Sequence, residues 1–318
     1  MAEDNNSVVI ENLVKQFGDF IAVDHINLAV RKDEVFGFLG PNGAGKSTTI
    51  RMLCGLLKPT SGHAQVAGYD VSREPESVRQ NIGYMSQKFS LYNDLRVIEN
   101  IRLFAGLYSV PSNQLSERIE WALEMANLKG QENLITGTLP GGWKQRLALG
   151  CAVLHKPPII FLDEPTSGVD PISRRQFWDL IHQMAEDGVT VFVTTHYMEE
   201  AEYCNRLALI FRGKMVALGT PSELKRKSMK GELLLVECEP LGSAVEVLQS
   251  APNVMDAAVF GNALHLVVHD AATAIPQVKK YLADHGLTVR RMEQIRPSLE
   301  DVFVSLTTAH DSRKERQA

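Results

Sequence analysis

The stretch that decides the fold is the glycine-rich segment Gly40-Pro41-Asn42-Gly43-Ala44-Gly45-Lys46-Ser47-Thr48. It fits the phosphate-binding pattern G-x-x-x-x-G-K-[ST] at every fixed position. Residues 35–39 before it form a short apolar run, typical of a buried parallel strand, and apolar residues between positions 50 and 57 repeat at helical spacing. The order strand, glycine loop, helix predicts a polyphosphate site, because backbone N–H groups and the helix dipole both point at the anion.

Individual residues of this loop carry distinct roles. Gly43 and Gly45 let the backbone curl so that successive N–H groups point inward. Lys46 is expected to reach the β- and γ-phosphates, and the Ser47 hydroxyl to join the coordination of Mg²⁺. An ordinary glycine-rich turn is the alternative, which the flanking strand and helix disfavour. The sequence therefore predicts a protein that binds a nucleoside triphosphate.

Composition narrows the classes of protein that remain. The chain has 318 residues, of which 44% are apolar and 22% charged, so two globular domains with large cores are feasible. A net charge of −5 argues against a dedicated nucleic-acid binder. One short basic run, Lys225, Arg226, Lys227 and Lys230, is expected to be either a solvated linker or a contact to anionic lipid.

Two absences point to a cytoplasmic protein without spans of its own. The cysteines, at positions 54, 151, 204 and 238, are far apart and form no C-x-x-C pair, as in a reduced protein with structural thiols. No apolar run approaches the roughly 20 residues that a spanning helix needs. If the protein acts at a membrane, another polypeptide must supply the spans.

Further candidate residues stand at the ends of predicted strands. Asp163 and Glu164 close the apolar run 159–162, where the carboxyl end of a strand can present them to a metal and a water; acids that merely cap the strand are the alternative. Gln87 ends the predicted strand 82–87, and His196 follows the strand 189–194. Each of these two could equally be an ordinary loop or structural residue.

Two other segments complete the motif set. Residues 8–30 predict two antiparallel strands, and Phe17 at the end of the first either stacks on adenine or simply packs. Residues 93–135 keep helical spacing and form a helical insert. The stretch 139–146 that ends the insert opens a further helix, and we expect Pro140 at its first position. The glycines beside it offer N–H groups to an anion.

Taken together, these residues resemble the ATP-binding subunits of ABC transporters over positions 8 to about 225. The motifs occur in the family's order, including a dimer-contact loop formed by Ser167, Gly168, Val169 and Asp170. Segments 40–49 and 163–171 look most like cassettes of exporters that move drugs, lipids or polysaccharides. The resemblance implies an α/β P-loop NTPase fold with a RecA-like core, an antiparallel β subdomain and a helical subdomain at about 88–155, within an ATPase domain at 1–228.

The resemblance also implies a mechanism. Two cassettes face head to tail, and ATP lies between the phosphate loop of one and the signature of the other. Asp163 and Gln87 join Ser47 around Mg²⁺, Glu164 acts as general base, and His196 contacts the γ-phosphate beside Lys46. The trans contact comes from the signature residues Leu139, Pro140, Gly141, Gly142 and Gln145.

One departure from the family lies in that signature, where Pro140 replaces the usual serine. The hydroxyl aimed at the partner's γ-phosphate is then absent, so we expect a slow homodimeric ATPase or pairing with a different cassette. A regulatory module that holds ATP stays open as an alternative. A soluble ABC protein acting on ribosomes or DNA is another, although such proteins typically carry two cassettes or a long coiled coil.

Beyond the cassette, residues 231–310 read β-α-β-β-α-β, a split βαβ or ferredoxin-like arrangement, followed by a tail at 311–318. We interpret 231–310 as an accessory domain for dimerisation or regulation. The expected partners are membrane-spanning permease subunits and a second cassette, with the protein peripheral on the cytoplasmic face of the membrane. Phe89, Leu91 and Tyr92 either dock such a permease or belong to the core of the helical insert.

Overall fold

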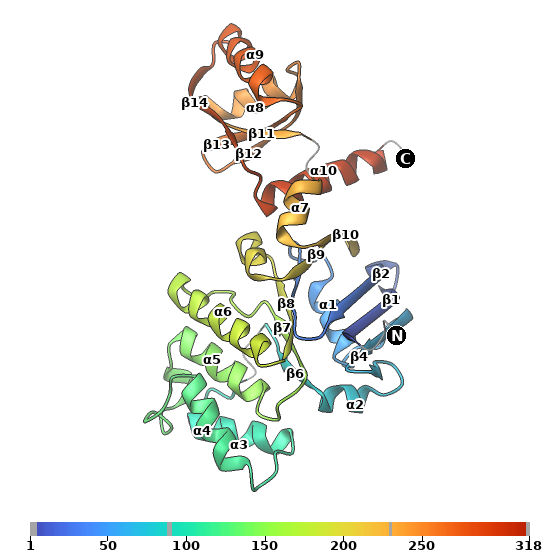
Figure 1. Ribbon diagram of the computed structural model, residues 1–318, viewed down its shortest axis with the longest axis vertical. Helices are drawn as coiled ribbons and strands as arrows, with labels where there is room; N and C mark the ends of the chain where they lie inside the picture. The colour runs from blue at the N-terminus through green and yellow to red at the C-terminus, as the bar shows by residue number, and fades with distance from the viewer. Residues whose placement is uncertain (1–4, 88–90, 229–230, 316–318) are drawn as a thin grey trace. The chain divides into compact units, whose positions relative to one another are not determined.

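The computed structural model describes residues 5–87, 91–228 and 231–315, so Phe89 and Lys230 lie outside the described residues. The chain divides into two compact units, Met1–Thr220 and Pro221–Ala318 (Figure 1). The segment at 221–228, which the sequence assigned to the ATPase domain, is helix α7 (Pro221–Ser228) of the second unit. There α7 contacts α10 (Leu299–Glu315), a helix that continues beyond residue 310.

The first unit is built on a six-stranded sheet in the order β10-β9-β3-β8-β7-β6. Its strands are parallel except β10, which pairs antiparallel with β9. Strands β3, β7 and β8 are buried along their whole length, which explains their nearly continuous apolar sequences. The bounds are β3 (Val35–Leu39), β6 (Ile82–Met85), β7 (Ile159–Asp163), β8 (Thr190–Thr195), β9 (Arg206–Phe211) and β10 (Lys214–Gly219).

A second, antiparallel sheet has the order β2-β1-β4-β5 and contains the predicted strand pair with its turn after Phe17. One core cluster joins this sheet to helix α1 and to Phe36 and Phe38 of the parallel sheet, so α1 is enclosed between the two sheets. The elements are β1 (Asn6–Phe17), β2 (Phe20–Arg31), β4 (Ser61–Val66), β5 (Tyr69–Asp70), α1 (Lys46–Leu53) and α2 (Pro75–Gln80).

The predicted helical insert is also present, and its helices gather at one end of the first unit (Figure 1). Its apolar residues join those of α6 and the other face of the parallel sheet in a single core cluster. Leu91 is buried in this cluster, whereas Tyr92 is 55% exposed. The insert contains α3 (Val97–Leu107), α4 (Leu115–Met125), η2 (Thr136–Thr138) and α5 (Gly141–Ala152), and the helices that follow it in the chain are α6 (Pro171–Glu186) and η3 (Met198–Tyr203).

The second unit has the predicted β-α-β-β-α-β order, and its sheet, β12-β13-β11-β14, is antiparallel throughout. Helices α8 and α9 share one core cluster with this sheet. Helix α9 begins directly after Asp270, which caps it by accepting from Thr273 N. The bounds are β11 (Glu232–Glu239), α8 (Leu241–Gln249), β12 (Val254–Phe260), β13 (Ala263–Val268), α9 (Ala271–Asp284) and β14 (Thr288–Ile295).

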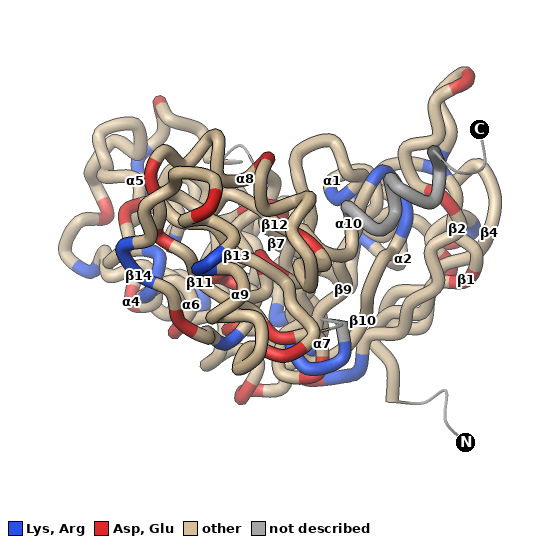
Figure 2. The backbone as a smooth tube through the Cα atoms, turned by 90° about the horizontal axis from the view of Figure 1, so that it is seen from above, with Lys and Arg blue, Asp and Glu red and all other residues tan. Residues whose placement is uncertain are grey.

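Charged residues of both signs are interspersed along the chain (Figure 2). The predicted basic run lies in the last turn of α7, with Lys225, Arg226 and Lys227, and Lys227 pairs with Glu223 one turn earlier. All four cysteines are free and buried, as structural thiols should be. Within the described ranges, no helix is both long enough and apolar enough to cross a bilayer.

Candidate active site

The phosphate loop connects β3 to α1, and its glycines are required by the backbone. Gly45 is the N-cap of α1 with φ 109°, and a Cβ there would lie 2.5 Å from the carbonyl oxygen of Ala22. Gly43 also has a positive φ, 78°. No side chain caps α1, so the loop directs the amino end of this helix toward the space that the phosphates would occupy.

Lys46, the first residue of α1, is 4% exposed and is held by three acceptors. Its Nζ donates to the carbonyl oxygens of Gly40 at 2.8 Å and Pro41 at 3.1 Å. It also forms an ion pair with Oε1 of Glu164 at 3.0 Å. The predicted phosphate ligand therefore lies directly beside the predicted general base.

Asp163, at the end of β7, accepts hydrogen bonds from two hydroxyl groups. Its Oδ1 accepts from Thr194 Oγ1 at 2.8 Å and from Ser47 Oγ at 3.1 Å. Burial raises the pKa of Asp163 above its ordinary value, although the two hydroxyl donors act in the opposite direction. A carboxylate next to a serine hydroxyl is a set of hard oxygen ligands, so these residues fit Mg²⁺.

Glu164 has a strained backbone and is fixed from two sides. Its φ is +49°, and its N–H donates to both the carbonyl oxygen and the Oγ1 of Thr194, at 3.1 and 3.0 Å. Its Oε2 lies 3.1 Å from Nε2 of Gln87 and 3.1 Å from Nδ1 of His196. The side chain is 6% exposed, so the carboxylate is held in one place by Lys46, Gln87 and His196.

The topology of the sheet explains why these residues meet. Strands β3, β7 and β8 are parallel neighbours, with Asp163 paired to Thr194 and Leu39 to Thr195. Their carboxyl ends share one edge of the sheet, which is where open α/β sheets place ligands. The loop at 40–48, the pair Asp163-Glu164, and His196 therefore converge, and Gln87 joins them two residues after β6.

The other predicted site residues are Phe17, the dimer-contact loop and the signature, and their side chains form no hydrogen bond or ion pair with Glu164 among the described residues. Phe17 is 50% exposed at the end of β1, with Lys15 Nζ 5.1 Å from its ring centroid, so it is not a core residue. Within the part of the chain that the structure describes, the dimer-contact loop connects to this cluster through Ser167 N, which donates to the carbonyl oxygen of Glu164 at 3.2 Å. Asp170 ends that loop by capping α6. Among the described residues, the side chain of Glu164 bonds to Lys46, Gln87 and His196 but to no signature residue.

The position of Pro140 differs from the prediction. We expected it at the first position of α5, but it is the N-cap, with φ −55° and ψ 151°, and the helix begins at Gly141. The extended ψ places Pro140 outside the helix while its carbonyl oxygen accepts from Trp143 N and Lys144 N, both at 3.1 Å. Leu139 before it and Gln145 after it are buried.

Thr194 is a residue of this cluster that sequence reasoning missed. It bonds the side chain of Asp163 and the backbone of Glu164, so it positions both acids. Its signal in the sequence is weak, since a threonine at the end of a strand is common. Only the pairing of β7 with β8 shows that it lies opposite Asp163.

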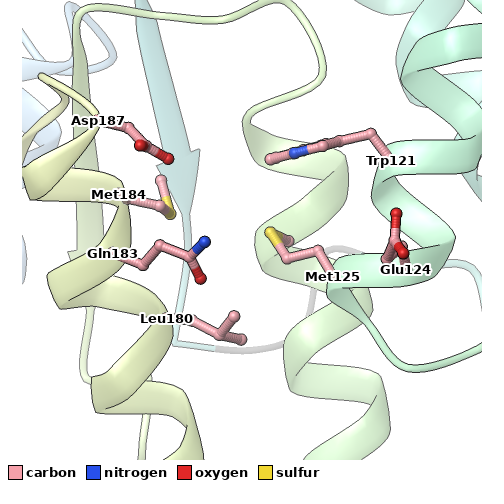
Figure 3. A pocket seen from close by; sticks show the side chains of 7 residues that line it. All are labelled: Trp121, Glu124, Met125, Leu180, Gln183, Met184 and Asp187. Atoms are coloured by element: carbon pink, nitrogen blue, oxygen red, sulfur yellow. The ribbon is translucent and has the colours of Figure 1, made fainter.

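A cavity of about 400 Å³ lies elsewhere, between α4 and α6. In Figure 3, Trp121 and Met125 of α4 face Leu180 and Met184 of α6 across this space. None of the predicted site residues lines it. The cavity is therefore separate from the acidic and basic cluster at the edge of the sheet.

Comparison with known proteins supports both units. Residues 23–167 match the family model described as ABC transporter, and residues 219–307 match the model described as ATP-binding protein DrrA1-3-like, C-terminal domain. The chain is 54% identical over 222 residues to the probable multidrug ABC transporter ATP-binding protein YbhF of Escherichia coli, covering 70% of this chain but 38% of that protein. It therefore spans well under half the length of YbhF.

Other relatives match along nearly their whole length. The linearmycin resistance ATP-binding protein LnrL of Bacillus subtilis is 34% identical over 302 residues, which is 93% of this chain and 97% of LnrL. The daunorubicin resistance ATP-binding protein DrrA3 of Streptomyces coeruleorubidus is 33% identical over 317 residues, 99% of each chain.

Solved structures give the same result for the fold. CbiO1 from Clostridium perfringens, part of the ABC transporter complex cbiONQ, superposes with a TM-score of 0.65 at 27% identity, over 70% of this chain and 92% of that one. A dimeric ATP-binding cassette, MJ0796 bound to ADP and Pi, has a TM-score of 0.61 at 29% identity, over 67% and 98%. The predicted fold class is confirmed, and the chain belongs to the family of ABC transporter ATP-binding proteins.

Proposed function

We propose that the chain is the ATP-hydrolysing subunit of a membrane exporter. The observation that carries this proposal is the convergence on Glu164 of Lys46, Gln87 and His196, each within 3.1 Å of one of its carboxylate oxygens. A phosphate ligand, a metal-shell amide and a histidine around one buried carboxylate form the set that phosphoryl transfer to water requires.

In the proposed reaction, Glu164 accepts the proton of the attacking water as general base. Its Oε2 is oriented by Gln87 and His196, and the backbone bonds to Thr194 keep the residue in its left-handed conformation. Lys46 and the N–H groups of the loop stabilise the charge on the phosphates. Catalysis therefore depends on positioning and charge stabilisation rather than on a covalent step.

Mg²⁺ is the metal that the site would hold, with Ser47, Asp163 and Gln87 as the residues around it. When bound, Mg²⁺ neutralises charge that develops on the phosphate oxygens. Ser47 and Thr194 both donate to Asp163 Oδ1. These two hydrogen bonds support the role in metal binding, because they hold a serine hydroxyl beside a carboxylate.

The proposed active form is a head-to-tail dimer with a second cassette, either a second copy or a different one. The loop 167–170 and the signature residues 139–142 and 145 would contact that partner and its ATP. The resemblance to a dimeric cassette bound to ADP and Pi supports this arrangement. Because Pro140 supplies no hydroxyl, we expect slow hydrolysis by a homodimer.

Transport partners are proposed from the relatives. LnrL and DrrA3 are named for resistance to linearmycin and daunorubicin, and cbiO1 is part of a transporter complex. We infer that this chain binds membrane-spanning permease subunits at the cytoplasmic face of the membrane, as a peripheral subunit. The names of these relatives do not favour a role on ribosomes or DNA.

Two measurements test the proposal. The purified chain should hydrolyse ATP in a Mg²⁺-dependent reaction, and a detergent extract should yield the chain with a stoichiometric multi-span partner. A chain that binds no nucleotide contradicts the site. Nucleotide binding without hydrolysis, in a chain with intact Glu164, favours the regulatory module that Pro140 leaves open.

A further inference from the structure

A buried carboxylate outside the set described above, Glu200, follows His196 in the chain and contacts the segment that follows Glu164. It stands in η3, directly after the His196 segment, and is 1% exposed. A carboxylate this deeply buried destabilises a protein unless it is paired and hydrogen-bonded. Its partners therefore indicate why a carboxyl group occupies this buried position.

Glu200 is bonded through one oxygen to the segment that follows Glu164. Its Oε1 accepts from Thr166 Oγ1 at 2.5 Å and lies 3.5 Å from Nε of Arg174. Thr166 stands between Glu164 and the dimer-contact loop 167–170, and is itself fully buried. Arg174 belongs to α6, the helix that Asp170 caps.

Arg174 also connects Glu200 to Glu164 through two aromatic residues, Tyr197 and His196. The guanidinium carbon of Arg174 lies 4.4 Å from the ring centroid of Tyr197. The Tyr197 ring is 4.1 Å from the ring of His196, whose Nδ1 contacts Glu164 Oε2. Together these contacts form a closed ring, the circuit, that begins and ends at the proposed general base and includes Glu200. Its members are Glu164, Thr166, Glu200, Arg174, Tyr197 and His196.

The second oxygen of Glu200 argues against a role in stability alone. Oε2 is buried and has no hydrogen-bond partner among the described residues. Leaving a carboxylate oxygen unsatisfied costs free energy that an apolar side chain of similar volume would avoid. A position that keeps such a group calls for another explanation.

We propose that Glu200 is a positioning residue that holds the loop 164–170 and His196 in one fixed relationship. This inference rests on the proposed function, because the group it positions is the Glu164–His196 pair. Glu200 does not touch the reacting atoms. Through Thr166 it fixes the position of the dimer-contact loop relative to the general base. Through Arg174 and Tyr197 it orients the imidazole of His196.

The chain offers a matched control for this inference. Glu34 is another buried carboxylate paired with an arginine, Arg206, at 3.0 Å. It precedes β3, at the end of the sheet opposite to the carboxyl ends that form the site. Glu34→Gln therefore removes a buried charge of the same kind without disturbing the circuit.

The experiment measures kcat and KM for ATP in the full-length chain, at a temperature where circular dichroism shows every variant to be folded. Glu200→Gln and Thr166→Val should each lower kcat about tenfold or more, with KM within about twofold of the parent. The double variant should be no slower than the slower single variant, because both changes break one circuit. Glu34→Gln should lower the melting temperature and keep kcat within about twofold.

A readout independent of hydrolysis completes the test. In chains labelled with ¹³C-histidine, the ring resonance of His196, assigned from a His196→Gln variant, should shift in Glu200→Gln and stay in place in Glu34→Gln. Parental kcat together with an unmoved His196 resonance in Glu200→Gln overturns the inference. If the parent does not hydrolyse ATP, the proposed function fails, and the His196 resonance still decides whether Glu200 positions this residue.

Discussion

The ammonium group of Lys46 lies 3.0 Å from a carboxylate oxygen of Glu164, and both side chains are almost fully buried. The two residues are far apart in the sequence, and each carries a separate predicted role. Because Lys46 also donates to two carbonyl oxygens, its three N–H donors are all engaged. A phosphate oxygen must therefore replace one of these acceptors, which couples nucleotide binding to the position of the general base.

Replacing Glu164 with glutamine should separate binding from hydrolysis. The amide keeps the shape of the side chain but cannot take up the proton of the attacking water, so kcat should fall by about 10²- to 10⁴-fold. Nucleotide should bind at least as tightly as in the parent, because the variant no longer has the carboxylate that competes with phosphate for Lys46. Steady-state hydrolysis and calorimetric titration with Mg²⁺-ATP measure the two effects. Hydrolysis at the parental rate would show that Glu164 is not the base.

Replacing Asp163 with asparagine should stabilise the fold while it impairs activity. The pKa of Asp163 is raised above 3.8 in the folded protein, so the folded state holds this proton more tightly than the unfolded chain does. The contribution of Asp163 to the free energy of unfolding therefore falls as pH rises from 3.8 through the folded pKa, and at neutral pH the group is destabilising.

Asp163→Asn removes that destabilising charge. The melting temperature at pH 7 should rise, and the gain should shrink as the pH falls through the folded pKa toward 3.8, where little of it should remain. Mg²⁺-dependent hydrolysis should decrease by about ten- to a hundredfold or more. Thermal unfolding across this pH range measures the first effect, and a variant that melts below the parent at pH 7 would contradict it.

Replacing Pro140 with serine should both strengthen α5 and speed hydrolysis. Serine is a favoured N-cap residue, and its hydroxyl also restores a donor for the partner's γ-phosphate. One charge-assisted hydrogen bond contributes about 1.5–3 kcal/mol, so the rate should rise at least severalfold. Pro140→Ala is the matched control, because it removes the ring without adding the hydroxyl. Equal rates in the two variants would show that the hydroxyl has no part in hydrolysis.

Leu91 and Tyr92 should behave differently, although they are adjacent. Leu91 is 7% exposed in the core of the insert, so Leu91→Ala should lower the free energy of unfolding by about 2–5 kcal/mol. Tyr92 is 55% exposed, so Tyr92→Ser should leave the melting temperature unchanged. If Tyr92 docks a permease, this variant should lose transport in vesicles and keep its basal ATPase rate. Full transport by Tyr92→Ser would exclude that docking role.

A chain that ends at Thr220 should fold and bind nucleotide. The site residues all precede this boundary, and the first unit has its own core clusters. Its affinity for ATP should lie within about twofold of that of the full chain. Circular dichroism and nucleotide titration test this expectation, and an insoluble product would contradict the boundary. A chain that ends at residue 228 is the control that retains α7.

The sequence alone determined the parts whose chemistry is local. The pattern at 40–48 predicts a phosphate loop because its glycine spacing, its lysine and its hydroxyl act within one turn of chain. Apolar runs that end in acids locate β7, and the alternation of strands and helices in the second unit predicts its ferredoxin-like order. Each of these inferences depends on neighbours in the sequence, so none requires knowledge of distant contacts.

Only the tertiary structure decided which distant groups meet. The pairing of β7 with β8 places Thr194 against Asp163, and a threonine at the end of a strand gives no local signal of that contact. The backbone strain at Glu164 and the bond from Thr166 to Glu200 likewise depend on packing between segments remote in sequence. Local pattern thus predicted the reactive groups, whereas the register of the sheet and the burial of charge selected the residues that hold them in place.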